Sequence, residues 1–144
     1  MSGIKVIDGE IFDDYRGRIS SLNDFHFEDI RRMYVITHPD THTVRAWHGH
    51  RFERKWFWCL QGSFTLAFVK VDDWENPSPD LEPEIFSVNA DKSTLICIPP
   101  GYANGLKACE AGSRIAVFSD KILEDALLDS WRYDKSMWMD WDKY

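Results

Sequence analysis

Short apolar segments separated by turn residues recur along most of the chain. Over 63–71, bulky apolar side chains fall at every second position, so they share one face of an extended backbone. A period of two is that of a β-strand. Segments with strand character cover 4–11, 19–22, 32–37, 44–50, 56–62, 85–88, 94–98, 104–108 and 114–118. Short strands at this spacing predict an all-β, antiparallel barrel.

Helical signals are confined to two places. Over 123–131, leucines fall at helical spacing, which predicts one short helix near the C-terminus. A helical turn is also expected over 23–28, because Asn23 or Asp24 can cap its first N–H groups. The final segment, 131–144, is rich in aromatic and charged residues and has no clear period.

Length and charge limit the possible functions. The chain has 144 residues, which favours a single domain over 1–144 with its own core. Its 17 Lys and Arg against 24 Asp and Glu give a net charge of −7, which argues against nucleic-acid binding and leaves room for a local basic pocket. The start lacks the apolar core of a signal peptide, and no apolar run has the length of a membrane span. We therefore expect a cytoplasmic protein with no nucleic-acid or membrane partner.

Cysteine and aromatic residues are expected to be structural. The three cysteines cannot all pair, and each lies in or beside a strand pattern, so we expect buried thiols in a reducing compartment: Cys59, Cys97 and Cys109. Three histidines fall in predicted loops and are expected at the surface: His26, His38 and His42. With 7 Trp and 9 Phe, a small barrel is expected to have an apolar face or edge that a second copy covers, which predicts a homodimer. A larger monomer core is the alternative.

The candidate chemistry is concentrated in the strand predicted over 44–50. His48 and His50 are two residues apart, so both project from one face of this strand. Lys55 follows five residues after His50, and Gly62 comes seven residues later. A Pro-Gly turn ends at Gly101, three residues before Asn104.

This spacing resembles the two cupin motifs, in which a barrel points histidines and a carboxylate at a metal. Lys55 stands where the motif has its acidic ligand, and Asn104 where it has its last histidine. An ammonium beside two histidines opposes a divalent cation, and an amide is a poor ligand for a transition metal. We therefore expect a pocket with neither metal nor cofactor.

Several segments together resemble a more specific group, the cupin nucleotide-sugar enzymes. The segments are 14–17, 44–50, 98–101 and 119–120, and the likeness covers most of the chain. It implies a cupin-type antiparallel β-barrel (jelly roll) with a short C-terminal helix. The first, second and third segments look like dTDP-4-dehydrorhamnose 3,5-epimerases. The second histidine, 30–34 and the segment from 119 to 134 look more like dTDP-4-keto-6-deoxyhexose 3,4-ketoisomerases.

The resemblance implies roles for particular residues. His48 matches the base that removes the proton beside the 4-keto group, and His50 matches the second histidine of the ketoisomerase pair. Arg16 and Arg45 match arginines that the epimerases use near the diphosphate and sugar. Lys55 lies close to the lysine that holds the developing enolate.

The chain also departs from the epimerase pattern at functional positions. The tyrosine that protonates the opposite face of the sugar should fall near Lys121 or Ile122, and neither is tyrosine. The aspartate that supports the base belongs to a C-terminal segment that this shorter chain lacks. Asn104 replaces a histidine. The branch of the family is therefore left open.

The same chemistry follows from the residues themselves. Removing a proton next to a ketone needs a base of near-neutral pKa and a cation at the oxygen where enolate charge develops. His48 could be the base, with Lys55 or Arg45 as the cation. His50 or Tyr34 could carry the second proton. In an unbroken strand Arg45 faces away from His48, so their convergence requires a bulge or a neighbouring chain.

Each of these residues also has a structural interpretation. The histidine pair could form a polar cluster in the core, Tyr34 could be a core residue, and Lys55 could extend from the barrel mouth. Arg16 could be a surface charge on a turn. Two further residues are expected to line the pocket and contact substrate: Tyr102 and Asn104.

The sequence is compatible with two classes of function. The first is a metal-independent isomerase of a nucleotide-linked 4-keto-6-deoxy sugar, in surface polysaccharide precursor synthesis, catalysing 3- or 3,5-epimerisation or, alternatively, 3,4-ketoisomerisation. The second is a cupin that binds a sugar nucleotide without catalysis. The retained histidine pair and both arginines favour the enzyme. The changed ligand positions favour the binding protein.

Overall fold

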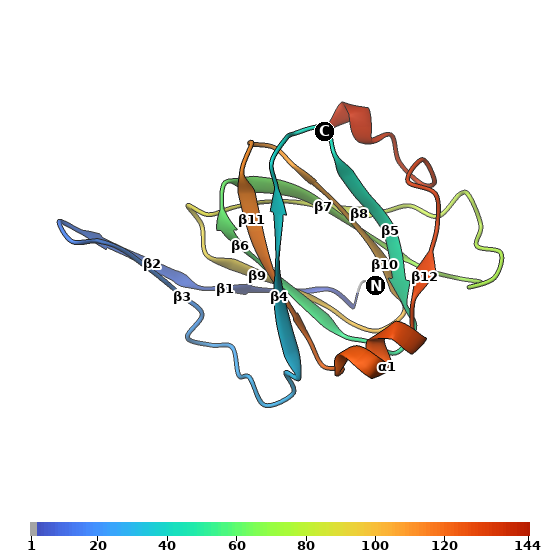
Figure 1. The fold of residues 1–144 in the computed structure, drawn as a ribbon, viewed down its shortest axis with the longest axis horizontal. Helices are drawn as coiled ribbons and strands as arrows, with labels where there is room; N and C mark the ends of the chain where they lie inside the picture. The colour runs from blue at the N-terminus through green and yellow to red at the C-terminus, as the bar shows by residue number, and fades with distance from the viewer. Residues whose placement is uncertain (1–2) are drawn as a thin grey trace.

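The computed structural model describes residues 3–144 as an antiparallel β-barrel made of two five-stranded sheets. Figure 1 shows the two sheets facing one another, with a two-stranded hairpin projecting from the barrel. The first sheet has the order β1-β9-β6-β11-β4 and the second β12-β5-β10-β7-β8. The predicted all-β, cupin-type jelly roll with a short C-terminal helix is confirmed.

The strand bounds agree closely with the apolar segments of the sequence. The first sheet consists of β1 (Lys5–Asp8), β9 (Thr94–Ile98), β6 (Lys55–Gln61), β11 (Ser113–Ser119) and β4 (Arg32–His38). The second consists of β12 (Trp131–Arg132), β5 (Val44–His50), β10 (Tyr102–Ala108), β7 (Ser63–Lys70) and β8 (Glu84–Asn89). The hairpin is formed by β2 (Glu10–Asp14) and β3 (Gly17–Ser21).

The main core lies between the two sheets and is built from inward-facing aromatic and branched residues. Its most deeply buried members are Phe64, Leu66, Phe68, Ile96, Ile115 and Val117. Burying one such side chain contributes about 1.5–3 kcal/mol. His38 is also buried, at 1% exposure, and its ring lies 5.7 Å from that of Phe64. The expectation that His38 is a surface residue was wrong, because it is the last residue of β4 and faces inward.

The segment predicted as one strand over 4–11 is divided at Gly9. The Gly9 N–H donates to the Ser93 carbonyl at 2.7 Å, and a Cβ at position 9 would collide with the Ser21 carbonyl. The chain therefore passes close to two neighbours at this point. It leaves β1 in the barrel sheet and continues as β2 in the projecting hairpin.

The helical turn predicted over 23–28 does not form, and the segment consists of turns and irregular backbone. Phe25 instead packs on the outer face of the first sheet, with its ring 5.8 Å from that of Trp56 and 5.9 Å from that of Phe118. Burial of this aromatic cluster outweighs the local preference for a cap.

The C-terminal helix is shorter than predicted. Helix α1 (Leu123–Leu128) ends before Asp129, whose carboxylate is engaged elsewhere, and Trp131 begins strand β12 instead of ending the helix. The aperiodic tail also contains a short 3₁₀ helix, η1 (Trp141–Lys143), with Trp141 buried. Among residues 3–144, no helix has the length and apolar character needed to cross a membrane.

Two of the three cysteines are buried as expected. Burial raises the pKa of Cys59 and of Cys97 to about 11, so neither thiol ionises near neutral pH. Cys109 is exposed, contrary to the prediction, because it follows the end of β10 and lies in the turn before β11.

Candidate active site

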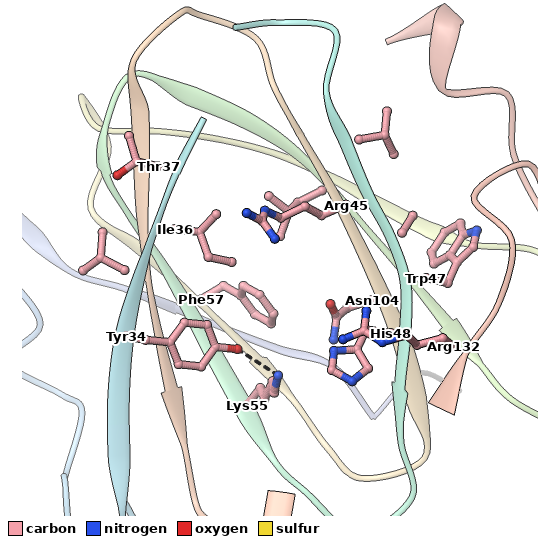
Figure 2. Close-up of a pocket in the computed structure, with 14 residues that line it drawn as sticks. Tyr34, Ile36, Thr37, Arg45, Trp47, His48, Lys55, Phe57, Asn104 and Arg132 are labelled. Carbon is pink, nitrogen blue, oxygen red and sulfur yellow. Dashed lines mark hydrogen bonds between the residues drawn. The ribbon is translucent and has the colours of Figure 1, made fainter. Parts of the chain in front are cut away.

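A β-bulge in β5 turns two of its polar side chains, those of Arg45 and His48, toward the same face. His48 lies opposite Asn104 of β10, and Arg45 lies opposite Leu106, so three steps along β5 match two along β10. One extra residue reverses the side-chain alternation on the bulged strand. Arg45 and His48 therefore face the same cavity, as Figure 2 shows. The sequence required either a bulge or a neighbouring chain for Arg45 and His48 to converge, and the structure contains the bulge.

The cavity lies in the barrel between the two sheets and has a volume of about 500 Å³. Its polar lining comes from five strands: Tyr34 and Thr37 of β4, Arg45 and His48 of β5, Lys55 of β6, Asn104 of β10 and Arg132 of β12. Three of these groups are cations, although the whole chain carries a net charge of −7. The cavity is thus the local basic pocket that the sequence left room for.

A smaller cavity of about 270 Å³ adjoins the first and shares four of its lining residues: Tyr34, His48, Lys55 and Arg132. Its walls add His50 and Glu53 on one side and Leu123, Ala126 and Leu127 of α1 on the other. Helix α1 therefore helps to enclose the histidine pair.

The two histidines lie side by side, with ring centroids 4.3 Å apart. The Nε2 atom of His48 lies 2.8 Å from the Ser130 hydroxyl oxygen. The Nδ1 atom of His50 lies 3.0 Å from the Asp129 carbonyl oxygen and 3.1 Å from Oε1 of Glu53. The residues that follow α1 therefore orient both rings.

Both imidazoles are neutral at physiological pH. Burial lowers the pKa of His48 to about 3, and the adjacent His50, Lys55 and Arg132 act in the same direction. Burial and Lys55 likewise lower the pKa of His50 to about 4. A neutral imidazole has a free lone pair, so the pair can accept protons, although both pKa values lie below the near-neutral range expected of the base.

Across the cavity, the Lys55 ammonium donates a hydrogen bond of 2.9 Å to the Tyr34 hydroxyl. Lys55 is only 5% exposed. It occupies the position of the acidic ligand in the cupin motif, and within residues 3–144 no three His, Cys, Asp or Glu side chains gather as a metal-binding group. A buried ammonium at this place disfavours a divalent cation and favours a developing negative charge.

A buried polar network supports the loop that follows β5. The Asp129 carboxylate accepts hydrogen bonds of 2.8–2.9 Å from three consecutive backbone N–H groups, those of Arg51, Phe52 and Glu53. The Arg54 N–H donates to Asp120 at 2.8 Å. These bonds fix the loop that carries Glu53 beneath the histidine pair.

Two of the predicted binding residues do not line the cavity. Tyr102 packs in the main core, where its hydroxyl accepts a hydrogen bond of 3.3 Å from the Gly3 N–H. Arg16 lies at the tip of the β2–β3 hairpin and pairs with Asp14 at 2.6 Å. Tyr102 is thus placed as a core residue, and Arg16 lines neither of the two cavities.

Sequence reasoning missed several residues around the site, among them Arg32, Glu53, Asp129 and Arg132. Arg132 reaches the cavity because its backbone pairs with that of His48, a pairing that the aperiodic tail gave no reason to expect. Glu53 lies in the polar run after His50. A charged residue directly after the histidine strand was the sequence feature that could have identified it. The other two belong to segments distant in sequence.

The family model described as "FdtA: WxcM-like, C-terminal" matches residues 2–137. The chain belongs to this family. No curated protein matches it in sequence.

Solved structures of nucleotide-sugar enzymes share the fold. The 3,4-ketoisomerase QdtA from Thermoanaerobacterium thermosaccharolyticum, in complex with TDP, is 22% identical, with a TM-score of 0.71 over 94% of this chain and 91% of that one. The rmlC epimerase of Mycobacterium tuberculosis is 19% identical, with a TM-score of 0.77 over 96% and 74%. The 3'-monoepimerase ChmJ from Streptomyces bikiniensis, in complex with dTDP-quinovose, is 16% identical, with a TM-score of 0.76 over 92% and 70%.

Proposed function

We propose that the protein is an isomerase of a nucleotide-linked 4-keto-6-deoxy sugar. The observation that carries this proposal is the pair of neutral imidazoles, His48 and His50, facing a cavity that also holds the Lys55 ammonium. Membership of the family supports it, as does the fold shared with ketoisomerases and epimerases. A mutant of the QdtA ketoisomerase has also been solved with TDP-4-keto-6-deoxyglucose bound.

In the proposed reaction, His48 removes the proton from the carbon next to the ketone. The electron pair of the broken C–H bond moves to the ketone oxygen, and the enolate charge is stabilised by the Lys55 ammonium. Arg45 and Arg132 supply further positive charge in the same cavity, which suits the diphosphate of a sugar nucleotide. None of these steps requires a metal, so we propose that the activity is metal-independent and that it persists after treatment with a chelator.

The possible reactions differ in the position on the sugar to which the proton is returned. Epimerisation at C3, or at C3 and C5, needs a donor on the face of the sugar opposite the base, and Tyr34 faces His48 from the other sheet. A 3,4-ketoisomerisation moves the proton to a neighbouring carbon, and His50 is available on the same wall as His48. Incubation with dTDP-4-keto-6-deoxyglucose in deuterated water, followed by proton NMR, distinguishes them by the carbon that gains deuterium.

The decisive variant is His48→Asn. An amide cannot accept a proton at neutral pH, so deuterium exchange next to the ketone should fall by roughly 100-fold or more while substrate binding is kept. His42→Asn, a change at an exposed loop histidine, is the matched control and should exchange as the parent does. Exchange by His48→Asn at the parent rate would refute His48 as the base. A parent that binds the sugar nucleotide and exchanges no proton would instead support a binding protein.

We also propose that the protein is a homodimer. Large apolar residues are exposed on the projecting hairpin, including Phe12 and Ile19, and on β4, where Met33 and Val35 are exposed. β4 is an edge strand that pairs only with β11 among the described strands. A second copy that covers these residues would remove an apolar surface and could bring Arg16 to the partner's cavity. Light scattering that gives a monomer at micromolar concentration would refute the dimer.

A further inference from the structure

Glu53 is a carboxylate with no exposed side-chain surface. Its Oε2 atom accepts a hydrogen bond of 3.0 Å from Arg32 and another from the Ser119 hydroxyl. Burying a charge is costly unless it is paired and hydrogen-bonded, and both conditions are met at this oxygen. The second oxygen, Oε1, has no hydrogen bond of good geometry within residues 3–144 and lies next to His50.

The surroundings of His50 define its tautomer. Its Nδ1 atom lies 3.0 Å from the Asp129 carbonyl oxygen and 3.1 Å from Oε1 of Glu53. A carbonyl and a carboxylate can only accept, so Nδ1 must carry the hydrogen. In the neutral ring the lone pair is then on Nε2. That atom is buried and has no hydrogen-bond partner among residues 3–144.

The charged and titratable groups around His50 come from every element packed on it: Arg32 of β4, His48 of β5, Glu53 of the following loop, Lys55 of β6 and Asp129 after α1. Two of these are cations, which oppose a positive charge on the ring. Glu53 is the carboxylate whose oxygen lies beside the ring nitrogen. It therefore offsets the repulsion that a protonated His50 would meet.

We propose that Glu53 is the positioning residue for His50: together with the Asp129 carbonyl it favours the Nδ1–H tautomer, which leaves Nε2 free to accept a proton, and it stabilises the imidazolium that results. This inference rests on the proposed function, in which His50 is a candidate for the second proton carrier. Nε2 accepts a proton from the substrate or from protonated His48 and later returns it, while Nδ1–H stays hydrogen-bonded to the Asp129 carbonyl.

The first test needs no substrate. Nitrogen-15 NMR of the parent protein at pH 7 should show His50 as the Nδ1–H tautomer, because the two ring nitrogens have distinct chemical shifts. Glu53→Gln should lower the pKa of His50 further, since the offsetting charge is gone. A parent with the Nε2–H tautomer would overturn the inference whether or not the protein is an enzyme.

The second test shows whether Glu53 acts through His50. Glu53→Gln keeps the size of the side chain and should reduce the rate of product formation by about 10- to 100-fold, with KM changed less than about twofold. The matched control is Glu124→Gln, on the exposed surface of α1, which should form product as the parent does. Circular dichroism should show that both variants are folded.

A double-mutant cycle separates positioning from a structural role. If Glu53 works through His50, adding Glu53→Gln to His50→Asn should cause no further loss of product formation. An equal loss in both backgrounds would show that Glu53 only supports the fold and would overturn the inference. Product formation by His50→Asn at the parent rate would also overturn it, while leaving His48 as the base and the proposed function intact. A parent without exchange, but with the Nδ1–H tautomer, would refute the proposed function instead.

Discussion

The Lys55 ammonium donates a 2.9 Å hydrogen bond to the Tyr34 hydroxyl, joining two strands of the first sheet at the cavity wall opposite the histidines. The hydroxyl accepts from a cation, so its own proton is free for the substrate. Lys55 and Tyr34 can therefore each donate a hydrogen bond to a ketone oxygen that carries negative charge. This arrangement gives Lys55 and Tyr34 separate, testable roles.

Replacing Tyr34 with phenylalanine should have a small effect if His50 carries the second proton. We expect turnover to fall less than about tenfold, because Lys55 keeps its charge at the cavity. Proton NMR of substrate and product in deuterated water measures both exchange and product. A loss of about 100-fold in product, with exchange next to the ketone preserved, would assign the second transfer to Tyr34 and favour epimerisation.

Replacing Lys55 with methionine removes the cation and keeps much of the side-chain volume. We expect kcat to fall by about 100- to 1,000-fold, because the enolate loses its main electrostatic partner. Lys55 also lowers the pKa values of His48 and His50, so both should rise in the variant. NMR titration of the histidines measures this second effect. Unchanged histidine pKa values together with full activity would contradict the role of Lys55.

Arg16 and Arg18 form a matched pair on the same hairpin. Both are paired with aspartates, Arg16 with Asp14 and Arg18 with Asp13 and Asp91. If Arg16 contacts the diphosphate in a dimer, Arg16→Ala should raise the Kd for TDP by about tenfold and change kcat little, since the contact is equal in ground and transition states. Arg18→Ala should bind as the parent does. If calorimetry gave equal affinities for TDP in the parent and both variants, Arg16 would not contact the diphosphate.

Stability should fall as the pH is lowered from 7 to 5. His48 and His50 have folded-state pKa values of about 3 and 4, below the ordinary value of 6.5. In this pH range the unfolded chain therefore binds more protons than the folded chain, and the free energy of unfolding decreases by at most about 1.4 kcal/mol per pH unit for each histidine. Urea unfolding at several pH values measures the slope. The double variant with asparagine at both positions should show a shallower slope, and an equal slope would contradict the burial of neutral rings.

The Asp129 carboxylate should matter for both stability and activity. An asparagine at this position offers only one accepting oxygen to three N–H donors, so Asp129→Asn should lower the free energy of unfolding by about 1–3 kcal/mol. Its activity should also fall, because the loop that positions Glu53 is released. Asp140→Asn, at the exposed cap of η1, is the control and should have a smaller effect on stability. Unfolding midpoints in urea compare the two variants.

The strand bounds and part of the site could be predicted from the sequence because they depend on local spacing. A period of two placed His48 and His50 on one wall, and the distances to Lys55 and Asn104 placed these two residues at the same cavity. The helical turn predicted over 23–28 failed for a non-local reason. Phe25 is buried against residues of β6 and β11, which no local propensity describes.

The sequence by itself determined the alternation of the strands, the neighbouring histidines and the replacement of the cupin metal ligands, since each of these depends on residues close together in the chain. Only the tertiary structure decided which other charges reach the histidines. The bulge turned Arg45 inward, pairing of β12 with β5 brought Arg132, and the packing of Arg32 and Ser119 around Glu53 stabilised a buried carboxylate. These contacts depend on backbone pairing and burial between distant segments, where side-chain period carries no information.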